Sequence, residues 1–180
     1  MNAKECITGR RSIRKFKDTP VSDEILADIV ETASYAPSWK NSQVTRYIAV
    51  RDNSLKDKIA DDISELYDGN TRIIKGAPLL IVVTLIKGRS GYERDGSFST
   101  PQGTHFQSFD AGLATEAFCL AAHEKGLGTV IMGIYDENKV KSVLSIPDER
   151  EVACLIAIGT PDEEPAAPRR KSVEDLLTFI

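Results

Sequence analysis

The stretch that decides the fold is "FDAGLATEAFCLAAHEKGLGTVIMG", residues 109–133. Its first part, from about Asp110 to Glu124, is apolar on nearly every side, which is typical of a helix buried in the middle of a protein. Gly126 follows at the position where glycine commonly ends a helix. The residues after it, "TVIMGI", have the β-branched composition of a strand. We therefore predict a central buried helix that passes directly into a strand.

Three more stretches have the composition of strands, because they are rich in β-branched and apolar residues. They are "TRYIAVR" (45–51), "LLIVVTLI" (79–86) and "EVACLIAIG" (151–159). Apolar spacing and capping residues predict four helices besides the central one: one that ends at Gly9, one from Ser22 to about Ala33, one over 53–67 behind an Asn or Ser cap, and one that begins after Asp136. Because strands and helices do not alternate strictly, we predict an α+β fold, with helices on both faces of one mostly antiparallel sheet.

A single domain accounts for the whole chain of 180 residues, since the sequence shows no repeat and no domain linker. We assign residues 1–180 to it. The segment over about 160–180 begins with a Pro-rich stretch and has too few apolar residues to form a core of its own. We expect it to be an extended arm that lies on a second subunit. Within it, "SVED" (172–175) has the pattern of a capping box and predicts a short helix.

The charge balance argues against large anionic partners. The formal net charge is −4, which makes the chain a poor general binder of nucleic acid or of an anionic membrane. The beginning of the sequence lacks the apolar region of a signal peptide. The longest apolar run, residues 77–86, is too short to span a bilayer. We therefore expect a cytoplasmic protein with neither a nucleic-acid nor a membrane partner.

The cysteines and histidines do not suggest a metal site or a nucleophile. Cys6, Cys119 and Cys154 lie far apart among apolar neighbours and form no CxxC pair, so we expect buried, reduced thiols. His105 and His123 lack the spacing of metal ligands. The sequence also contains no GxSxG, HExxH or P-loop motif. If the protein is an enzyme, a cofactor is expected to carry the chemistry.

Two basic clusters stand at opposite ends of the chain. They are Arg10, Arg11, Arg14 and Lys15 in "GRRSIRKF" (9–16), and Arg169, Arg170 and Lys171 in "PRRKS" (168–172). Arginine side chains suit phosphate, and the Ser12 hydroxyl could complete a binding site. Two interpretations remain open: unrelated solvated charges, or one phosphate held from both sides.

Two further features bear on a ligand. "GLGTVIMG" (126–133) contains three glycines, but they follow a helix and precede a strand, which is the reverse of a dinucleotide fingerprint. Those glycines more plausibly end the helix and let the backbone approach a flat ligand. In "APSWKNSQ" (36–43), Trp39 could stack on a ligand, or it could fill an edge of the core. Residues 87–105 are predicted to form a long surface loop that covers a site.

Taken in order, four segments resemble the nitroreductase family of FMN-dependent oxidoreductases. "RRSIRKF" (10–16) is similar to the family's phosphate-binding opening, and "ASYAPSWKNSQ" (33–43) is similar to its "APSxxNxQ" loop. Residues 109–133 resemble its central helix, "GLG" and glycine strand. "PRRKSVEDLL" (168–177) resembles its closing basic segment. The resemblance covers nearly the whole chain and implies an obligate, intertwined homodimer with two FMN sites at the interface.

The resemblance also implies roles for individual residues. The FMN phosphate is assigned to Arg10, Arg11, Ser12, Arg169 and Lys171. Arg14 is placed beside the N1 and C2-oxygen side of the flavin, where a cation stabilises the reduced ring. Lys15 receives no role. At position 73, an isoleucine stands where many members carry a cation, which leaves more of this stabilisation to Arg14.

The flavin ring is expected to contact residues from both subunits. The resemblance places Pro37, Ser38, Trp39 and Asn41 of the other subunit along the isoalloxazine, Asn70 at the pyrimidine edge, and Ile131, Met132 and Gly133 along the ring. The implied activity is ping-pong transfer of hydride from NADH or NADPH, through flavin N5, to a small-molecule acceptor such as a nitroaromatic or a quinone. No catalytic side chain is implied.

Other functions stay open on the sequence alone. Within the family, a reductive dehalogenase and an enone reductase are alternatives. A flavin-binding protein without turnover, which stores or senses FMN, is an alternative of another class. A nucleic-acid-binding module that uses the basic clusters is a third, which the net charge of −4 opposes.

Overall fold

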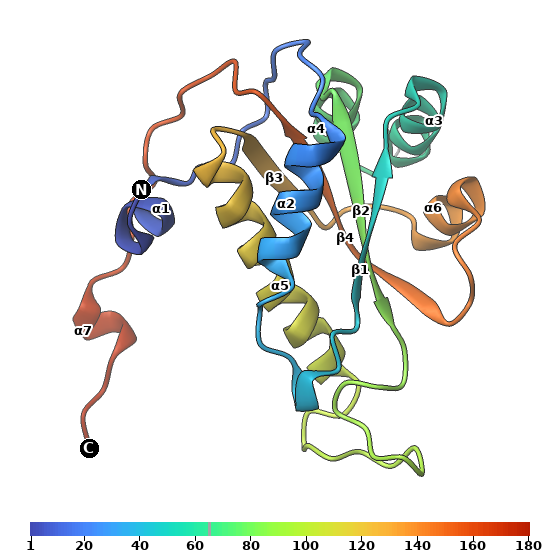
Figure 1. The fold of residues 1–180 in the computed structure, drawn as a ribbon, viewed down its shortest axis with the longest axis vertical. Coiled ribbons are helices and arrows are strands. Elements are labelled where there is room, and N and C mark those ends of the chain that lie inside the picture. The colour runs from blue at the N-terminus through green and yellow to red at the C-terminus, as the bar shows by residue number, and fades with distance from the viewer. Residues whose placement is uncertain (65) are drawn as a thin grey trace.

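The computed structural model describes residues 1–64 and 66–180 (Figure 1). Within them, four strands form one sheet in the order β1-β2-β4-β3: β1 (Thr45–Val50), β2 (Leu79–Ile86), β3 (Gly128–Met132) and β4 (Arg150–Gly159). Every neighbouring pair is antiparallel. The four predicted strands and the antiparallel α+β fold are therefore confirmed.

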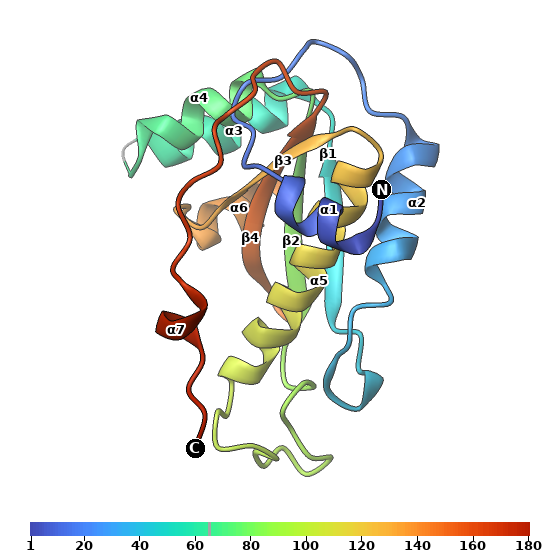
Figure 2. The same cartoon turned by 90° about the vertical axis from the view of Figure 1, so that its left-hand side faces the viewer.

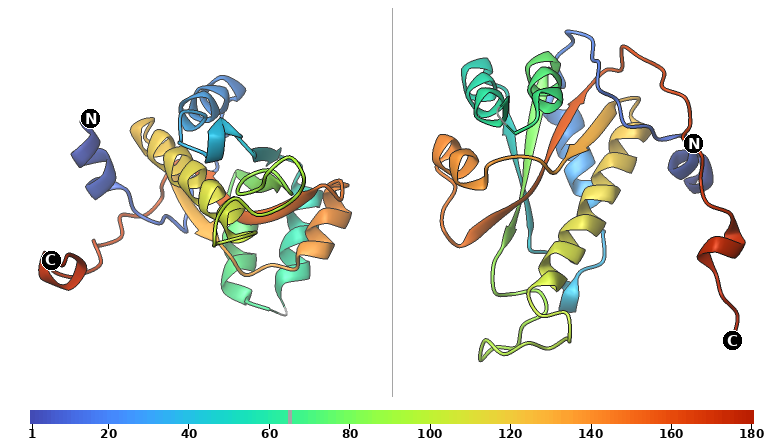
Figure 3. Two further views of the ribbon diagram at one scale, coloured as in Figure 1. Left: turned by 90° about the horizontal axis from the view of Figure 1, so that it is seen from below. Right: turned by 180° about the vertical axis from the view of Figure 1, so that it is seen from behind.

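Helices cover both faces of this sheet. The helices of the described chain are α1 (Ala3–Gly9), α2 (Asp23–Ala33), α3 (Asn53–Ser64), α4 (Asp68–Gly76), α5 (His105–Glu124), α6 (Glu137–Leu144) and α7 (Val173–Leu176), with a short 3-10 turn, η1, at Trp39–Asn41. α2 and α5 pack on one face, while α3, α4 and α6 pack on the other (Figure 3). The prediction of helices on both faces is confirmed.

The two helical layers explain the unbroken apolar run of β2. Successive side chains of a strand point to opposite faces, so Ile81 and Val83 pack with Phe118 of α5. Leu80 and Val82 lie in the other apolar cluster, with α3, α4 and α6. Because water reaches neither face, β2 has no polar alternation. Burial of each such side chain contributes about 1.5–3 kcal/mol of hydrophobic free energy.

The central helix α5 is longer than its sequence pattern indicates. It begins at His105, five residues before the predicted start at Asp110. The preceding loop covers this additional turn. The Gly88 amide of the loop donates a hydrogen bond to the buried side chain of Gln107, in the first turn of α5. The predicted end is confirmed: Gly126 has φ +76°, and the Leu127 amide donates to the Ala122 carbonyl. A residue with a side chain would be strained there.

Side-chain caps fix the ends of the shorter helices. Ser22 caps α2 by accepting from the Ile25 amide, and Asp136 caps α6 by accepting from the Lys139 amide. The predicted capping box of α7 also forms, between Ser172 and Asp175. All three caps satisfy amides that a helix start leaves without partners.

The region of α3 and α4 differs from the prediction. The cap of α3 is neither Asn53 nor Ser54 but Asp52, whose carboxylate accepts from the Leu55 amide at 3.1 Å. α3 ends at Ser64, and Glu65, which the predicted helix included, lies outside the described residues. α4 was not predicted at all, because it is short and contains two glycines that obscure its periodicity.

The two ends of the chain run side by side along the edge strand β3. The Ile13 amide donates to the Thr129 carbonyl at 2.9 Å, which ties the first basic cluster to β3. The Lys17 amide donates to Thr160 O, and the Asp162 amide donates to Lys15 O. Beyond these contacts the arm leaves the sheet and descends past α1 to the exposed α7 (Figure 2).

Among residues 1–64 and 66–180, no helix combines the length and the apolar composition needed to cross a membrane.

Gly128 allows the close approach between the first basic cluster and β3, so we predict that Gly128→Ala destabilises the fold. A Cβ atom at this position would lie 2.5 Å from Ile13 Cγ1. Such overpacking costs about 1–3 kcal/mol, which urea denaturation measures as a lower midpoint. Gly76→Ala is the matched control, because no atom lies within 4 Å of the new Cβ there. Equal midpoints for the two variants would contradict the prediction.

Candidate functional site

The two basic clusters meet in space. Arg10, Arg11, Ser12 and Arg14 line a cavity of about 290 Å³, and the opposite wall comes from the arm, through Pro165, Ala166, Pro168 and Arg170. We call this cavity the anion cleft. Arg170 is the basic residue of the arm that lines it; its neighbours Arg169 and Lys171 are exposed beside it. The role expected of Arg169 and Lys171 stays a prediction.

Most of the positive charge in the anion cleft is not neutralised by carboxylates. Arg11 donates to the carbonyls of Thr8 and Arg10, at 2.7 and 2.9 Å, and Arg14 donates to the Ser12 carbonyl at 3.3 Å. Within the described part of the chain, Arg10 alone of the cleft cations lies within 4 Å of a carboxylate, that of Glu116 at 3.9 Å. Like charges that converge without an anion repel one another. The cleft is therefore built to attract an anion.

Two titratable side chains, His123 and Glu163, lie close to the first basic cluster. Burial lowers the pKa of His123, and the charges of Arg10 and Arg11 lower it further. On the arm, the Glu163 carboxylate accepts hydrogen bonds from the backbone amides of Arg14 and Lys15. These amides thus already hold one negative group, which is the kind of ligand that the cleft favours.

A second cavity adjoins the anion cleft between β3 and α4. Its volume is about 730 Å³, and Arg14 lines both cavities. Three other residues that the resemblance placed at the flavin ring line it, namely Asn70, Ile131 and Met132, and Lys15, which received no role, lines it as well. We call this cavity the ring cleft. A charged cleft that opens into a larger, mixed cleft suits a ligand with an anionic end and a bulkier, less polar end.

The walls of the ring cleft are fixed by local structure. Asn70 is buried and donates from its amide nitrogen to the Ile134 carbonyl at 3.2 Å, which ties α4 to the segment after β3. Strand alternation turns Met132 into the core and leaves the Ile131 side chain 46% exposed. Gly133 is exposed, with no atom within 4 Å of its Cβ position. Among the β3 residues that line the cleft, Ile131 therefore presents an exposed apolar side chain, whereas Gly133 is not one of the lining residues.

Sequence reasoning missed several residues of this cleft, among them Tyr67 and Arg72. The Arg72 side chain is largely exposed and pairs with Asp68 at 3.3 Å. Ile73 stands where the resemblance implied a cation, whereas α4 carries a cation one residue earlier, at Arg72. If α4 is recognised as an amphipathic helix with Asn70 and Ile74 on its buried face, Arg72 falls on the exposed face as a candidate site residue.

The third expected component lies elsewhere in the same chain. Trp39 contacts the beginning of α5: its amide donates to Asp110 at 2.9 Å, and its ring packs edge-on against Phe106. Arg11 instead shares a cavity with His123, near the end of α5. A helix of 20 residues spans about 30 Å. Within one chain, Pro37, Ser38, Trp39 and Asn41 are therefore not brought to the two clefts.

The turn over residues 38–43 is conformationally unusual. Lys40, Asn41 and Gln43 have φ values of +46°, +54° and +45°. Asparagine tolerates this left-handed region, but for other side chains it costs about 1–3 kcal/mol each. Trp39 is half-buried, so its ring fills an edge of the packing as one interpretation had it, and its buried Nε1 has no hydrogen-bond partner among the described residues.

The thiols are free, as expected, and two of the three are buried. Burial raises the pKa of Cys119 and raises that of Cys154 to about 11. Cys6 was expected to be buried but is only half-buried, because α1 rests on the outside of α5 without a further layer over it. Among the residues described, no group of three His, Cys, Asp or Glu side chains is placed to hold a metal ion.

Comparison with known proteins identifies relatives along nearly the whole chain. A family model described as the nitroreductase family matches residues 7–160. A nitroreductase family protein from Clostridium novyi NT is 32% identical, with a TM-score of 0.79 over 91% of this chain and 87% of that one. An FMN-dependent nitroreductase from Clostridium difficile R20291 is 28% identical, with a TM-score of 0.78 over 98% of each chain. An NADPH-dependent oxidoreductase from Staphylococcus haemolyticus is 28% identical over 88% of this chain and 64% of that protein.

We predict that occupation of the anion cleft raises the pKa of His123. The neutral imidazole is favoured in the folded chain, so the unfolded chain binds the proton more readily and falling pH destabilises the fold through this group. Inorganic phosphate between Arg10 and Arg11 would offset their charges and shift the pKa back toward its ordinary value. NMR titration of the imidazole protons measures this shift.

The control for this titration is direct, because the chain has two histidines. His105→Gln leaves the His123 resonance alone in the spectrum. Replacing Arg10 and Arg11 by Gln is expected to raise the pKa of His123 and to abolish the response to phosphate. A titration curve that phosphate leaves unchanged in the wild-type chain would argue against the anion cleft.

Proposed function

The chain belongs to the nitroreductase family and is an oxidoreductase, and from this premise we propose that it binds FMN and passes hydride from NADH or NADPH to a small acceptor. One observation carries the proposal: two basic segments from opposite ends of the chain form an anion cleft that opens, at Arg14, into a ring cleft. The order of the two cavities matches a ligand with a phosphate at one end and a flat ring at the other.

The residues of the anion cleft fit the phosphate of FMN. Guanidinium groups bind phosphate oxygens with charge-assisted hydrogen bonds, and the Ser12 hydroxyl adds a neutral donor. We assign the phosphate to Arg10, Arg11 and Ser12, with the basic cluster of the arm, Arg169–Lys171, closing over it. Repulsion among these cations is relieved when the anion binds.

The residues of the ring cleft fit an isoalloxazine. Ile131 provides an exposed apolar side chain along one wall, and Asn70 lies on the opposite wall, on α4. When bound, FMN supplies the chemistry of accepting and releasing hydride. Arg14, at the junction of the two clefts, places a positive charge where reduction of the ring adds negative charge. The proposal requires no side chain to act as an acid or a base.

Reductant and acceptor are proposed to use the ring cleft in turn. A ping-pong order follows from one open cleft, since NAD(P)H must leave before a nitroaromatic or a quinone can take its place. The nicotinamide and such acceptors are flat, so each can stack in turn on the face of the isoalloxazine that the protein wall at Ile131 leaves open. The cleft thus selects for planar, electron-poor molecules by shape.

We propose that the working form is a homodimer. The turn that carries Pro37, Ser38, Trp39 and Asn41 lies at the far end of α5 from the anion cleft, so a second copy has to supply it. The arm exposes Val173, Leu176, Phe179 and Ile180, which is unusual for an isolated chain. Sedimentation at micromolar concentration checks this: a monomer that nevertheless binds FMN would contradict the shared site.

Binding of FMN is the first test of the proposed function. The wild-type protein should acquire a flavin absorption spectrum, and replacing Arg10 and Arg11 together by Gln should weaken binding at least about tenfold, because each lost charged hydrogen bond costs about 1.5–3 kcal/mol. Lys17→Gln removes one exposed charge outside the anion cleft and should leave the affinity nearly unchanged.

Anaerobic mixing with NADH and with NADPH then separates an enzyme from a flavin store. Loss of the flavin absorption, followed by its return on adding a nitroaromatic or a quinone, supports the oxidoreductase. Bound FMN that neither reductant bleaches would instead favour the store or sensor. A protein that does not bind FMN at all would contradict both functions.

We predict that Arg14→Ala lowers the midpoint potential of bound FMN, by an amount on the order of tens of millivolts for an exposed charge. The lost guanidinium no longer stabilises the reduced ring. Arg72→Ala is the matched control, since Arg72 lines the same cleft but is paired with Asp68, and it should change the potential less. Potentiometric titration measures both. An unchanged potential in Arg14→Ala would show that another group carries this role.

A further inference from the structure

The turn over residues 38–43 lies outside the apolar core and is held by polar contacts. None of its residues belongs to the apolar core clusters of the described chain. Yet Lys40, Asn41 and Gln43 are kept at positive φ, and such conformations persist only where the surroundings impose them. The contacts that impose this conformation point to what the turn is for.

The first contact is the carboxylate of Asp110, on the buried side of the turn. Asp110 is 2% exposed, and its Oδ2 accepts from the Trp39 amide at 2.9 Å and from the Ser90 hydroxyl at 2.5 Å. A buried carboxylate is costly unless it is well hydrogen-bonded. Its other oxygen, Oδ1, is buried with no hydrogen-bond partner among the described residues. The position of Asp110 is thus set by the turn and the loop together.

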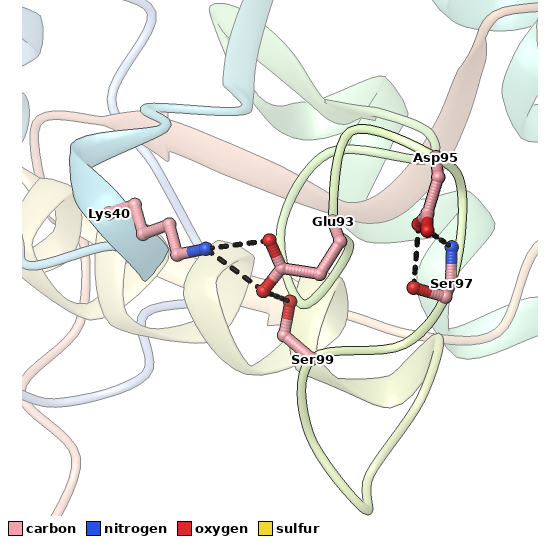
Figure 4. A network of polar contacts seen from close by, with 5 residues as sticks. All are labelled: Lys40, Glu93, Asp95, Ser97 and Ser99. Carbon is pink, nitrogen blue, oxygen red and sulfur yellow. Dashed lines mark hydrogen bonds and ion pairs between the residues drawn. The ribbon is translucent and has the colours of Figure 1, made fainter.

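The second contact is the carboxylate of Glu93, on the exposed side of the turn. Both of its oxygens lie 3.0 Å from Lys40 Nζ, and it accepts from the Ser99 hydroxyl at 2.6 Å (Figure 4). The hydrogen bonds from Ser99 and Lys40 lower the pKa of Glu93, which keeps it ionised at neutral pH. Lys40 Nζ also lies 5.3 Å from the centre of the Trp39 ring.

The two carboxylates act on consecutive residues. Asp110 holds the backbone of Trp39, and Glu93 holds the side chain of Lys40. Each is bonded in turn to a serine of the same long loop, Ser90 or Ser99. The loop over 87–104 is therefore fastened to the turn at two points, and the rings of Trp39 and Phe106 pack between them.

We propose that Asp110 and Glu93 are positioning residues, which set the conformation of the Trp39–Asn41 turn and thereby how it meets the flavin bound to the partner subunit. This inference rests on the proposed function, because the turn reaches a flavin only in the dimer. Although the 87–104 loop lies far from the two clefts of its own chain, the proposal gives it a role in the site. Through Ser90 and Ser99 the loop fixes the orientation of Trp39 and Asn41 toward the partner.

The experiment uses the intrinsic fluorescence of the protein, because Trp39 is its single tryptophan. Emission wavelength and acrylamide quenching are measured for the full chain without and with FMN. The variants are Asp110→Asn and Glu93→Gln, which remove a charge at nearly constant volume. Asp95→Asn is the matched control, since Asp95 lies on the same loop and its hydrogen bonds in the described part of the chain come from Ser97 and not from the turn (Figure 4).

Both variants are expected to shift Trp39 emission to longer wavelength and to increase its quenching, while Asp95→Asn matches the wild type. FMN affinity should fall about tenfold or more in Asp110→Asn and about two- to fivefold in Glu93→Gln, as the loss of a buried and of an exposed contact implies. The visible absorption bands of bound FMN should change shape in both, which a loss of stability alone would not produce.

The outcomes that overturn the proposal are distinct from failure of the proposed function. A wild-type protein that binds no FMN overturns the function itself. Wild-type binding, with emission, quenching, affinity and flavin spectrum unchanged in both variants, overturns the positioning role alone. A shift of Trp39 emission without any change in the bound flavin also overturns it, because the turn would then not bear on the ring. If Asp110→Asn does not fold, Glu93→Gln decides, since its exposed pair with Lys40 is not needed for folding.

Discussion

The enclosure of β2 and β4 between two layers of helices is the constraint on which the rest of the structure depends. Both strands are central in the sheet, and their side chains fill the apolar clusters on either face. A ligand cannot reach a sheet covered in this way except at its edges. The edge strand β3 is where the first basic cluster pairs with Thr129 and where both clefts lie. The site lies at this edge because helices cover both faces of the sheet.

The anion cleft is an electrostatically unfavourable arrangement that is held in place largely by uncharged contacts, beside one carboxylate, that of Glu163, which accepts from the amides of Arg14 and Lys15. Backbone hydrogen bonds bring the two ends of the chain together, from Ile13 to Thr129 and from Lys17 to Thr160. Each contributes about 0.5–1.5 kcal/mol net. The close packing of Gly128 against Ile13 fixes how closely the first basic cluster approaches β3. Because these contacts involve no charge, the arginines can converge before any anion arrives, and the binding energy of the anion is not consumed in building its site.

The features that the sequence predicted correctly are those determined by residues close together in the chain. The strands, the caps at Ser22 and Asp136 and the end of α5 at Gly126 depend on nearby residues, and they were found. The first turn of α5 was missed because it is stabilised by the distant Gly88 amide, and α4 was missed because its glycines hide its packing on the sheet. The arginines at 10–14 were recognisable as a motif. Which basic residue of the arm faces them was not, because the path of the arm in space decides it.

Construction of the anion cleft from both ends of the chain has a consequence for the timing of assembly. The ribosome makes residues 10–14 early and the arm that carries Arg170 late, so the cleft does not exist until synthesis has passed the last strand. The sheet is complete at Gly159, whereas the anion cleft also needs the arm that follows it. A bound anion therefore requires the arm to be in place, and a protease cut within the exposed arm would leave the sheet intact but open one wall of the cleft.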